Sequence, residues 1–141
     1  MKLEIVTVPV TPLAQNARII YVEGDREAAL IDPGGEVELL VDALSARELV
    51  PRQIWLTHSH FDHCGAVAGL KRRYPLRLYA HEAGRQLRAS VLEYCSFFGM
   101  PPGLMENCPE PDEYLTHGQE LAVGGVAFTA LHTPGHCPDH C

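Results

Sequence analysis

The sequence predicts an α/β fold in which helices flank a mixed β-sheet. Residues 3–31 alternate apolar and polar side chains and contain a hairpin signal, a pattern typical of antiparallel strands. Residues 36–98 alternate helical stripes with short apolar runs, which is the order of a βαβα unit with parallel strands. A second hairpin pattern follows a loop rich in glycine and proline. Because both kinds of strand pairing are predicted, we expect a mixed sheet.

Three strands are expected before the first helix. Residues 3–10 alternate and end in a turn that is flanked by Pro9 and Pro12, which favours an edge strand. Residues 17–23 and 27–31 flank the dipeptide Gly24-Asp25, so we expect them to form a hairpin. The turn at residues 32–35 then ends the third strand.

The next segment predicts two helices around a buried strand. Residues 36–49 carry an apolar stripe at i, i+3, i+4 and i+7, the spacing of one helix face. This stripe consists of Val37, Leu40, Val41 and Leu44. Residues 53–57 are apolar without alternation, as in a strand that is buried on both faces. A second helix is expected over residues 66–74.

The rest of the chain predicts a strand, a long helix and a hairpin. Residues 77–80 form the strand, and residues 81–98 are expected to form one helix with an apolar side. A loop follows to about residue 113. Residues 120–123 and 126–132 are then expected to pair across two glycines. With no repeat and no linker in the chain, we expect a single domain over residues 1–141.

The composition excludes several classes of function. The chain has 46% apolar and 21% charged residues, as soluble globular proteins do. Its net charge is −7, which disfavours a nucleic-acid partner. No apolar run is long enough to cross a membrane, and we see no signal peptide. Five cysteines without regular spacing favour a reducing cytoplasmic location over a disulfide framework.

A dense group of potential metal ligands follows the predicted strand at residues 53–57. His58, His60, Asp62 and His63 lie within six residues. In an extended segment, side chains two residues apart project to the same side, so His58 and His60 are expected to face one point. A turn at Phe61 can bring the other two ligands toward a second point. Imidazoles with a carboxylate suit zinc, and also iron or manganese.

A second segment presents a further imidazole. His136 follows the last predicted strand and comes directly after Pro134-Gly135, which force a tight turn. A stiff loop of this kind can aim a side chain at a fixed point. We therefore expect His136 to supply the third imidazole beside His58 and His60.

These motifs resemble those of the metallo-β-lactamase superfamily. The stretch T-H-S-H-F-D-H is similar to its H-x-H-x-D-H signature, T-P-G-H-C-P-D-H to its second motif, and Asp32-Pro33-Gly34 to its first. The resemblance implies an αββα sandwich, of which this chain holds the N-terminal half to two-thirds. Because Cys141 comes five residues after His136, we expect the sequence to be incomplete at its C-terminus.

The resemblance also implies a chemistry. One metal would bind His58, His60 and His136, while Asp62 and His63 would begin a second site; in a complete protein we expect two zinc ions. Asp62 would be catalytic, since it would also orient a metal-activated water that attacks an acyl carbon. The pattern is most similar to small glyoxalase II-like thioesterases, which implies a small-molecule substrate.

Three alternatives remain open at the level of sequence. The chain could be a mononuclear iron persulfide dioxygenase, or a non-catalytic remnant that binds metal. It could also complete itself as a homo-oligomer.

Further residues have weaker roles in the sequence. Asp32 is expected on the floor of the site without metal contact, and Asp139 stands where relatives more often carry glycine. For His140, a contact to substrate or to the metal ligands and the absence of any such role are both open. Five other residues are expected to have ordinary structural roles. Cys64 and Cys137 are expected to be small buried side chains, and His81, His117 and His132 to be turn or strand residues.

Overall fold

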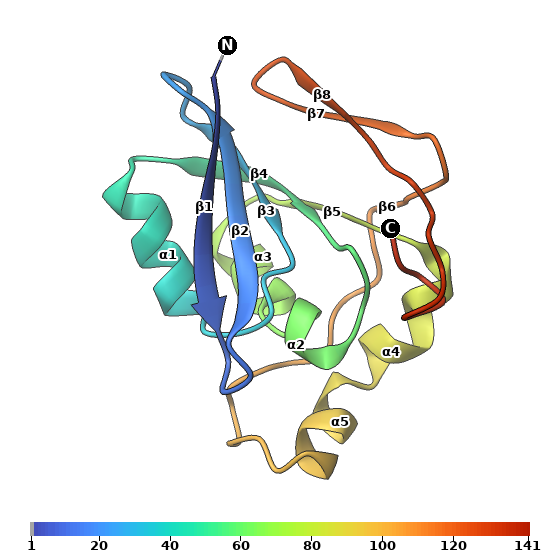
Figure 1. The fold of residues 1–141 in the computed structure, drawn as a ribbon. Helices are drawn as coiled ribbons and strands as arrows, with labels where there is room; N and C mark the ends of the chain where they lie inside the picture. The colour runs from blue at the N-terminus through green and yellow to red at the C-terminus, as the bar shows by residue number, and fades with distance from the viewer. Residues whose placement is uncertain (1) are drawn as a thin grey trace.

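The computed structural model describes residues 2–141 and contains a six-stranded mixed sheet and a separate two-stranded sheet (Figure 1). The large sheet has its strands in sequence order. The first three are antiparallel and the last three extend the sheet in parallel. The six strands are β1 (Leu3–Val10), β2 (Gln15–Val22), β3 (Glu27–Ile31), β4 (Val50–Trp55), β5 (Arg77–Ala80) and β6 (Glu113–Tyr114). The antiparallel hairpin of the small sheet consists of β7 (Glu120–Val123) and β8 (Val126–Thr129).

Helices cover one face of the large sheet, and the β7–β8 hairpin packs against the other face (Figure 1). The helical segments are α1 (Val37–Ala46), α2 (Phe61–Cys64), α3 (Val67–Arg73), η1 (Glu82–Gly84), α4 (Arg85–Ala89) and α5 (Val91–Phe97). Because successive side chains of a strand point to opposite faces of the sheet, each strand contributes side chains to both layers. On β2, Ile19 packs in the helix-side core, whereas Ile20 packs with Leu121 and Val123 of β7.

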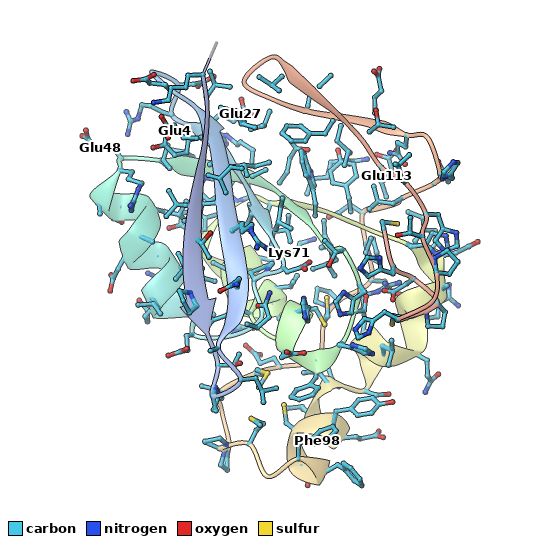
Figure 2. All side chains as sticks on the ribbon, viewed as in Figure 1. Glu4, Glu27, Glu48, Lys71, Phe98 and Glu113 are labelled. Carbon is cyan, nitrogen blue, oxygen red and sulfur yellow. The ribbon has the colours of Figure 1, made fainter. Side chains whose placement is uncertain are left out.

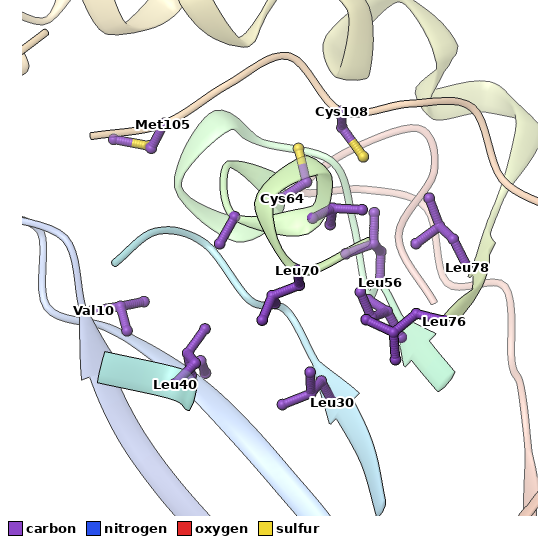
Figure 3. Close-up of a cluster of buried hydrophobic side chains, with 14 of the residues drawn as sticks. Val10, Leu30, Leu40, Leu56, Cys64, Leu70, Leu76, Leu78, Met105 and Cys108 are labelled. Atoms are coloured by element: carbon purple, nitrogen blue, oxygen red, sulfur yellow. The ribbon is translucent and has the colours of Figure 1, made fainter. Parts of the chain in front are cut away.

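The helix-side core is the larger of the two (Figure 3). Leu40 and Leu44 of α1 are fully buried, as the apolar stripe predicted. They pack with Leu30 of β3 and Leu70 of α3 in one cluster. Cys64 is also fully buried in this cluster, as expected for a small apolar side chain. This core fixes the helices that flank the loop after β4.

Most strands lie where the sequence predicted them. The expected strands at residues 3–10, 27–31 and 77–80 have the same bounds in the structure, and β1 is an edge strand. The apolar run at residues 53–57 overlaps β4, which begins three residues earlier and ends at Trp55. Its Ile54 and Trp55 contribute to opposite cores, as predicted for a strand covered on both faces.

The expectation of one continuous helix over residues 81–98 is wrong. The structure breaks it into η1, α4 and α5, with the last break at Ser90. The reason is that a distant loop takes over the hydrogen bonds of the helix ladder. The Arg88 carbonyl accepts from the Cys108 N–H at 2.9 Å, and the Leu92 N–H donates to the Asn107 side chain at 2.9 Å. Among residues 2–141, no helix has the length and apolar character needed to span a membrane.

We predict that the α1 stripe carries much of the stability of the helix-side core. Leu44→Ala should lower the free energy of unfolding by about 2–5 kcal/mol, because it removes a fully buried side chain and leaves a cavity. The control is Leu39→Ala on the same helix, where the side chain is 43% exposed. Urea unfolding measures both, and equal losses in the two variants would contradict the assignment of the buried face.

Candidate metal centre

Three imidazoles from two distant loops converge in the structure. His58 and His60 follow β4, and His136 lies in the segment after β8. The ring centroids of the three are 4.8 to 5.0 Å apart. One nitrogen from each lies within 4.8 Å of the other two. The structure therefore brings together the three residues that the sequence grouped for one metal.

Asp32 anchors this group from the end of β3. Its backbone has a positive φ of 52°, a left-handed conformation that aspartate tolerates better than most residues. Its side chain is buried and accepts three hydrogen bonds. Two come from Thr57, from the backbone N–H at 2.7 Å and the hydroxyl at 2.5 Å, and one comes from His63 Nδ1 at 2.9 Å. The carboxylate thus holds the start of the metal-ligand loop and one of its imidazoles.

This arrangement also fixes the tautomer of His58. An ionised carboxylate only accepts, so the Thr57 hydroxyl donates to Asp32 and its oxygen is left to accept. His58 Nδ1 lies 3.1 Å from that oxygen and is therefore the protonated nitrogen. The lone pair of His58 then resides on Nε2, which is buried and has no hydrogen-bond partner in the described residues. A supporting hydrogen bond of this kind is how metal-binding histidines are usually oriented.

The same reasoning applies to His63. Its Nδ1 donates to Asp32, so its free lone pair lies on Nε2. That nitrogen is 3.9 Å from a carboxylate oxygen of Asp62. Asp62 and His63 are thus adjacent at the first turn of α2, where the sequence placed a second group of ligands. The His58 and His63 rings are 4.0 Å apart, so the two groups adjoin.

A glycine allows α2 to approach the Asp32 turn. A Cβ at Gly34 would lie 1.6 Å from the carbonyl oxygen of Asp62. Only glycine therefore fits where the turn after β3 meets the helix that carries Asp62 and His63.

Asp32, His58 and His63 also lie close enough together to resemble a metal site. Both oxygens of Asp32 are already used in the hydrogen bonds to Thr57 and His63. Asp32 therefore anchors the loop through these hydrogen bonds, and its lack of metal contact stays a prediction.

The electrostatics keep His58 available as a ligand. Burial, with the charge of nearby His63 as a second cause, lowers the pKa of His58 to about 4. Burial and the neighbouring His136 also lower the pKa of His60. Both rings are therefore held toward the neutral form, which is the form that binds metals. Burial opposes protonation of His63, but the hydrogen bond and charge of Asp32 outweigh it and raise its pKa.

These residues fit a divalent cation. His58 is only 5% exposed, and its Nε2 has no hydrogen-bond partner within residues 2–141. A buried nitrogen left without a partner costs about 1–3 kcal/mol, and a bound cation would remove that cost. Three imidazoles with an adjoining carboxylate form a donor set suited to zinc, iron or manganese.

The comparisons with known proteins agree with this geometry. The sequence profile of the metallo-beta-lactamase superfamily matches residues 11–141. The chain belongs to this superfamily. It shares the fold of the crystal structure of the BLEG-1 B3 metallo-beta-lactamase with a TM-score of 0.84 and 32% identity, over 97% of this chain and 65% of that one. TTHA1623 in a di-iron-bound form gives a TM-score of 0.83 and 35% identity, over 96% and 64%.

Curated relatives of this chain are longer than it is. A hydroxyacylglutathione hydrolase, GloC, from Haemophilus influenzae is 35% identical over 142 residues, which is 99% of this chain and 64% of that protein. A probable metallo-hydrolase, YqgX, from Bacillus subtilis is 33% identical, over 92% and 60%. The chain thus spans about three-fifths of the length of these relatives.

The superfamily's second motif is tied to the first in this structure. The Cys141 N–H donates to the Thr57 carbonyl at 2.7 Å, which joins the two ligand-bearing segments. Within the second segment, Thr133 bonds His140 through both its backbone N–H and its hydroxyl. The His140 ring is 5.3 Å from the His58 ring and 6.2 Å from the His136 ring, so this residue lies beside the candidate centre.

Sequence reasoning missed one functional residue, Arg88. Its side chain on α4 is completely buried and donates to Ser59, which lies between His58 and His60, at 3.0 Å. It also pairs with Glu110 at 2.7 Å and lies 3.9 Å from Asp139. Arg88 therefore links both ligand-bearing segments. No local signal in the sequence marks it, since an arginine at a helical position usually lies in solvent.

Asp139 differs from an ordinary surface aspartate. It is 1% exposed, and neither carboxylate oxygen has a hydrogen-bond partner in the described part of the chain. Arg88 is thus its closest compensating charge. Neighbouring Cys137 is buried as well, and burial together with the nearby Asp139 carboxylate raises its pKa to about 11. Such a thiol stays protonated at neutral pH and is a poor metal ligand.

The remaining histidines form a separate group. His81 and His132 stack with ring centroids 4.0 Å apart. His81 accepts from the Ala83 N–H, His132 contacts the Pro138 carbonyl, and His117 accepts from the His132 N–H. These contacts shape turns, which is the role that the sequence suggested for them.

We predict that Asp32→Asn weakens metal binding by about 10–100-fold, since it disturbs the hydrogen bonds that orient His58 and His63. Asparagine also tolerates the left-handed backbone, so the fold should survive. Competition with a chromophoric chelator measures the affinity. The matched control is Asp42→Asn on the exposed side of α1. Unchanged affinity in a folded Asp32→Asn protein would contradict the orienting role.

We also predict that Arg88→Met lowers the free energy of unfolding by about 3–5 kcal/mol, because it leaves the buried Asp139 without a compensating charge. The double variant Arg88→Met/Asp139→Asn should recover part of this loss. Arg85→Met is the control, since Arg85 also pairs with Glu110 but is 72% exposed. A loss for Arg88→Met that is no greater than for the control, measured in urea, would overturn this account.

Proposed function

We propose that the protein is a metal-dependent hydrolase that cleaves a thioester or related acyl compound, as glyoxalase II-like enzymes do. The observation that carries the proposal is the pair of adjoining ligand groups, in which Asp32 directs the free nitrogens of His58 and His63. The hydroxyacylglutathione hydrolase name of a 35% identical relative supports the choice of reaction.

The residues of this chain would divide the work. His58, His60 and His136 would hold one metal, and Asp62 and His63 would contribute to a second. When bound, such metals supply a water of lowered pKa and a Lewis-acidic centre for the acyl oxygen. Asp62 is the only carboxylate among the five predicted ligands. It would accept a hydrogen bond from the attacking water and so orient it. Thr57 and Asp32 would keep both rings in the required tautomers.

We propose zinc as the physiological metal and two ions in the complete protein. A 35% identical protein has been solved in a di-iron-bound form, which supports a two-metal centre and makes iron the competing metal. A cytoplasmic location is part of the proposal, because the five cysteines are all free in the structure and four of them are buried.

We expect the natural gene product, checked by intact mass and loaded with metal, to bind about two ions and to hydrolyse S-lactoylglutathione or another thioester. His58→Ala should lower kcat/KM by at least about a hundredfold, because it removes one of the three imidazoles proposed to hold the first metal. His117→Ala is the control, since His117 is exposed and outside the centre. Metal analysis and a thiol-release assay measure these outcomes.

Two other results would replace the proposal. One iron per chain, with oxygen consumption on a glutathione persulfide and no loss of iron in His63→Ala, would identify a mononuclear dioxygenase. One tightly bound metal without turnover of any ester, lactone or thioester would identify a non-catalytic metal-binding protein.

A further inference from the structure

A small apolar cavity opens directly beside the candidate metal centre. Its volume is about 220 Å³. One wall belongs to the centre, and the others come from α2, α4 and α5. The lining residues are His60, Phe61, Asp62, Leu87, Tyr94 and Phe98. A molecule that reacts at the centre can therefore extend into this cavity.

The aromatic rings of the cavity are nearly parallel. Phe61 is only 9% exposed, so its ring is held in place by the fold. The Phe98 ring stacks on it at 5.3 Å with an angle of 10° between the planes. Tyr94 lies 6.4 Å from Phe61 at an angle of 13°. Parallel rings favour a flat apolar group, because it can contact their faces.

The position of these rings follows from the packing of α5. Tyr94 and Phe98 are on or next to α5, and they remain 40% and 55% exposed. Figure 2 shows Phe98 at the end of α5, on the side of the molecule away from β7 and β8. Because α5 packs against α2, these side chains lie beside Phe61, at the edge of the helix-side core.

The charges at the cavity disfavour a polar occupant. No lysine or arginine lines it, and the single charged residue in its wall is the acidic Asp62. An anionic or strongly hydrated group would lose its water here without gaining a cation. An apolar group would gain about 25 cal/mol for each Å² of surface that it buries.

The size of the cavity limits which part of a substrate it can hold. Pockets that enclose a whole drug-sized ligand usually have about 300–1,000 Å³. This cavity is smaller, so it fits one part of a substrate, next to the reacting carbon. A peptide-like thiol such as glutathione exceeds it and is also charged.

We propose that this cavity binds the acyl group of the substrate, and that this group is apolar and preferably aromatic rather than small and hydroxylated. The proposal rests on the proposed function, since it takes the reacting carbon to lie at the metal centre. It separates this chain from enzymes selective for lactoyl thioesters, whose acyl group would find no polar partner on the aromatic walls.

The test uses thioesters of one neutral thiol, N-acetylcysteamine, so that only the acyl group varies. The metal-loaded natural protein should hydrolyse the phenylacetyl thioester with a kcat/KM at least about tenfold above that for the lactoyl thioester. Phe98→Ala should reduce this ratio by about tenfold. Phe97→Ala is the matched control, because its side chain is 81% exposed and does not line the cavity. A preference for lactoyl that Phe98→Ala leaves unchanged would overturn the proposal while the hydrolase function stands.

A binding measurement separates the two proposals. Phenylacetate, titrated into the metal-loaded protein and followed by NMR of the aromatic rings, should bind more tightly than lactate and should lose affinity in Phe98→Ala. If no thioester is hydrolysed but this binding is seen, the proposed function fails and the assignment of the cavity stands. If phenylacetate does not bind, and both Phe97→Ala and Phe98→Ala convert a dimer to a monomer in light scattering, the rings form an interface between copies and the acyl site is refuted.

Discussion

The buried carboxylate of Asp32 is the interaction on which the candidate centre depends. It sits where β3 ends, in a left-handed conformation. It accepts one hydrogen bond from His63 and two from Thr57, whose hydroxyl oxygen in turn lies 3.1 Å from His58 Nδ1. Because a carboxylate only accepts, the protons of Thr57, His58 and His63 are assigned in one direction. In the neutral rings, this chain of donors leaves Nε2 of both His58 and His63 unprotonated. Without a group of this kind, the His58 ring could take either tautomer and would present a lone pair only part of the time.

The second constraint is the joining of two segments that are far apart in the sequence. His136 can meet His58 and His60 only if the segment after β8 is held against the loop after β4. The backbone hydrogen bond from the Cys141 N–H to the Thr57 carbonyl holds the two segments together at one point. Buried Arg88 holds them at another, where it contacts both Ser59 and Asp139. Burying an arginine beside a carboxylate is costly in solvation, so this contact adds little net stability. It instead specifies how the two segments meet, because each charge is tolerated only in the other's presence.

Some of this could be predicted from the sequence and some could not. Local patterns fixed the β1, β3 and β5 strands, since alternation and flanking turns depend on neighbouring residues. The side chains that converge at the candidate centre could also be found, because four of them lie within six positions, although their role as metal ligands stays a prediction. The break at Ser90 was not, since Asn107 and Cys108 cause it from another part of the chain. Arg88 was missed for the same reason: its burial depends on Ser59, Glu110 and Asp139, which no helical pattern reveals.

The loop after β4 carries polar and apolar side chains on consecutive residues, and these point in different directions. His60 is extended, and α2 begins at Phe61, so the chain changes direction between them. His60 therefore faces His58 and His136, while the Phe61 ring turns toward Phe98. Asp62 then returns to the centre beside His63. Because one helical turn carries both the polar centre and the base of the aromatic cavity, a bound acyl group would lie within contact of the ligands themselves. Phe61, between His60 and Asp62, thus gives the candidate centre an apolar side.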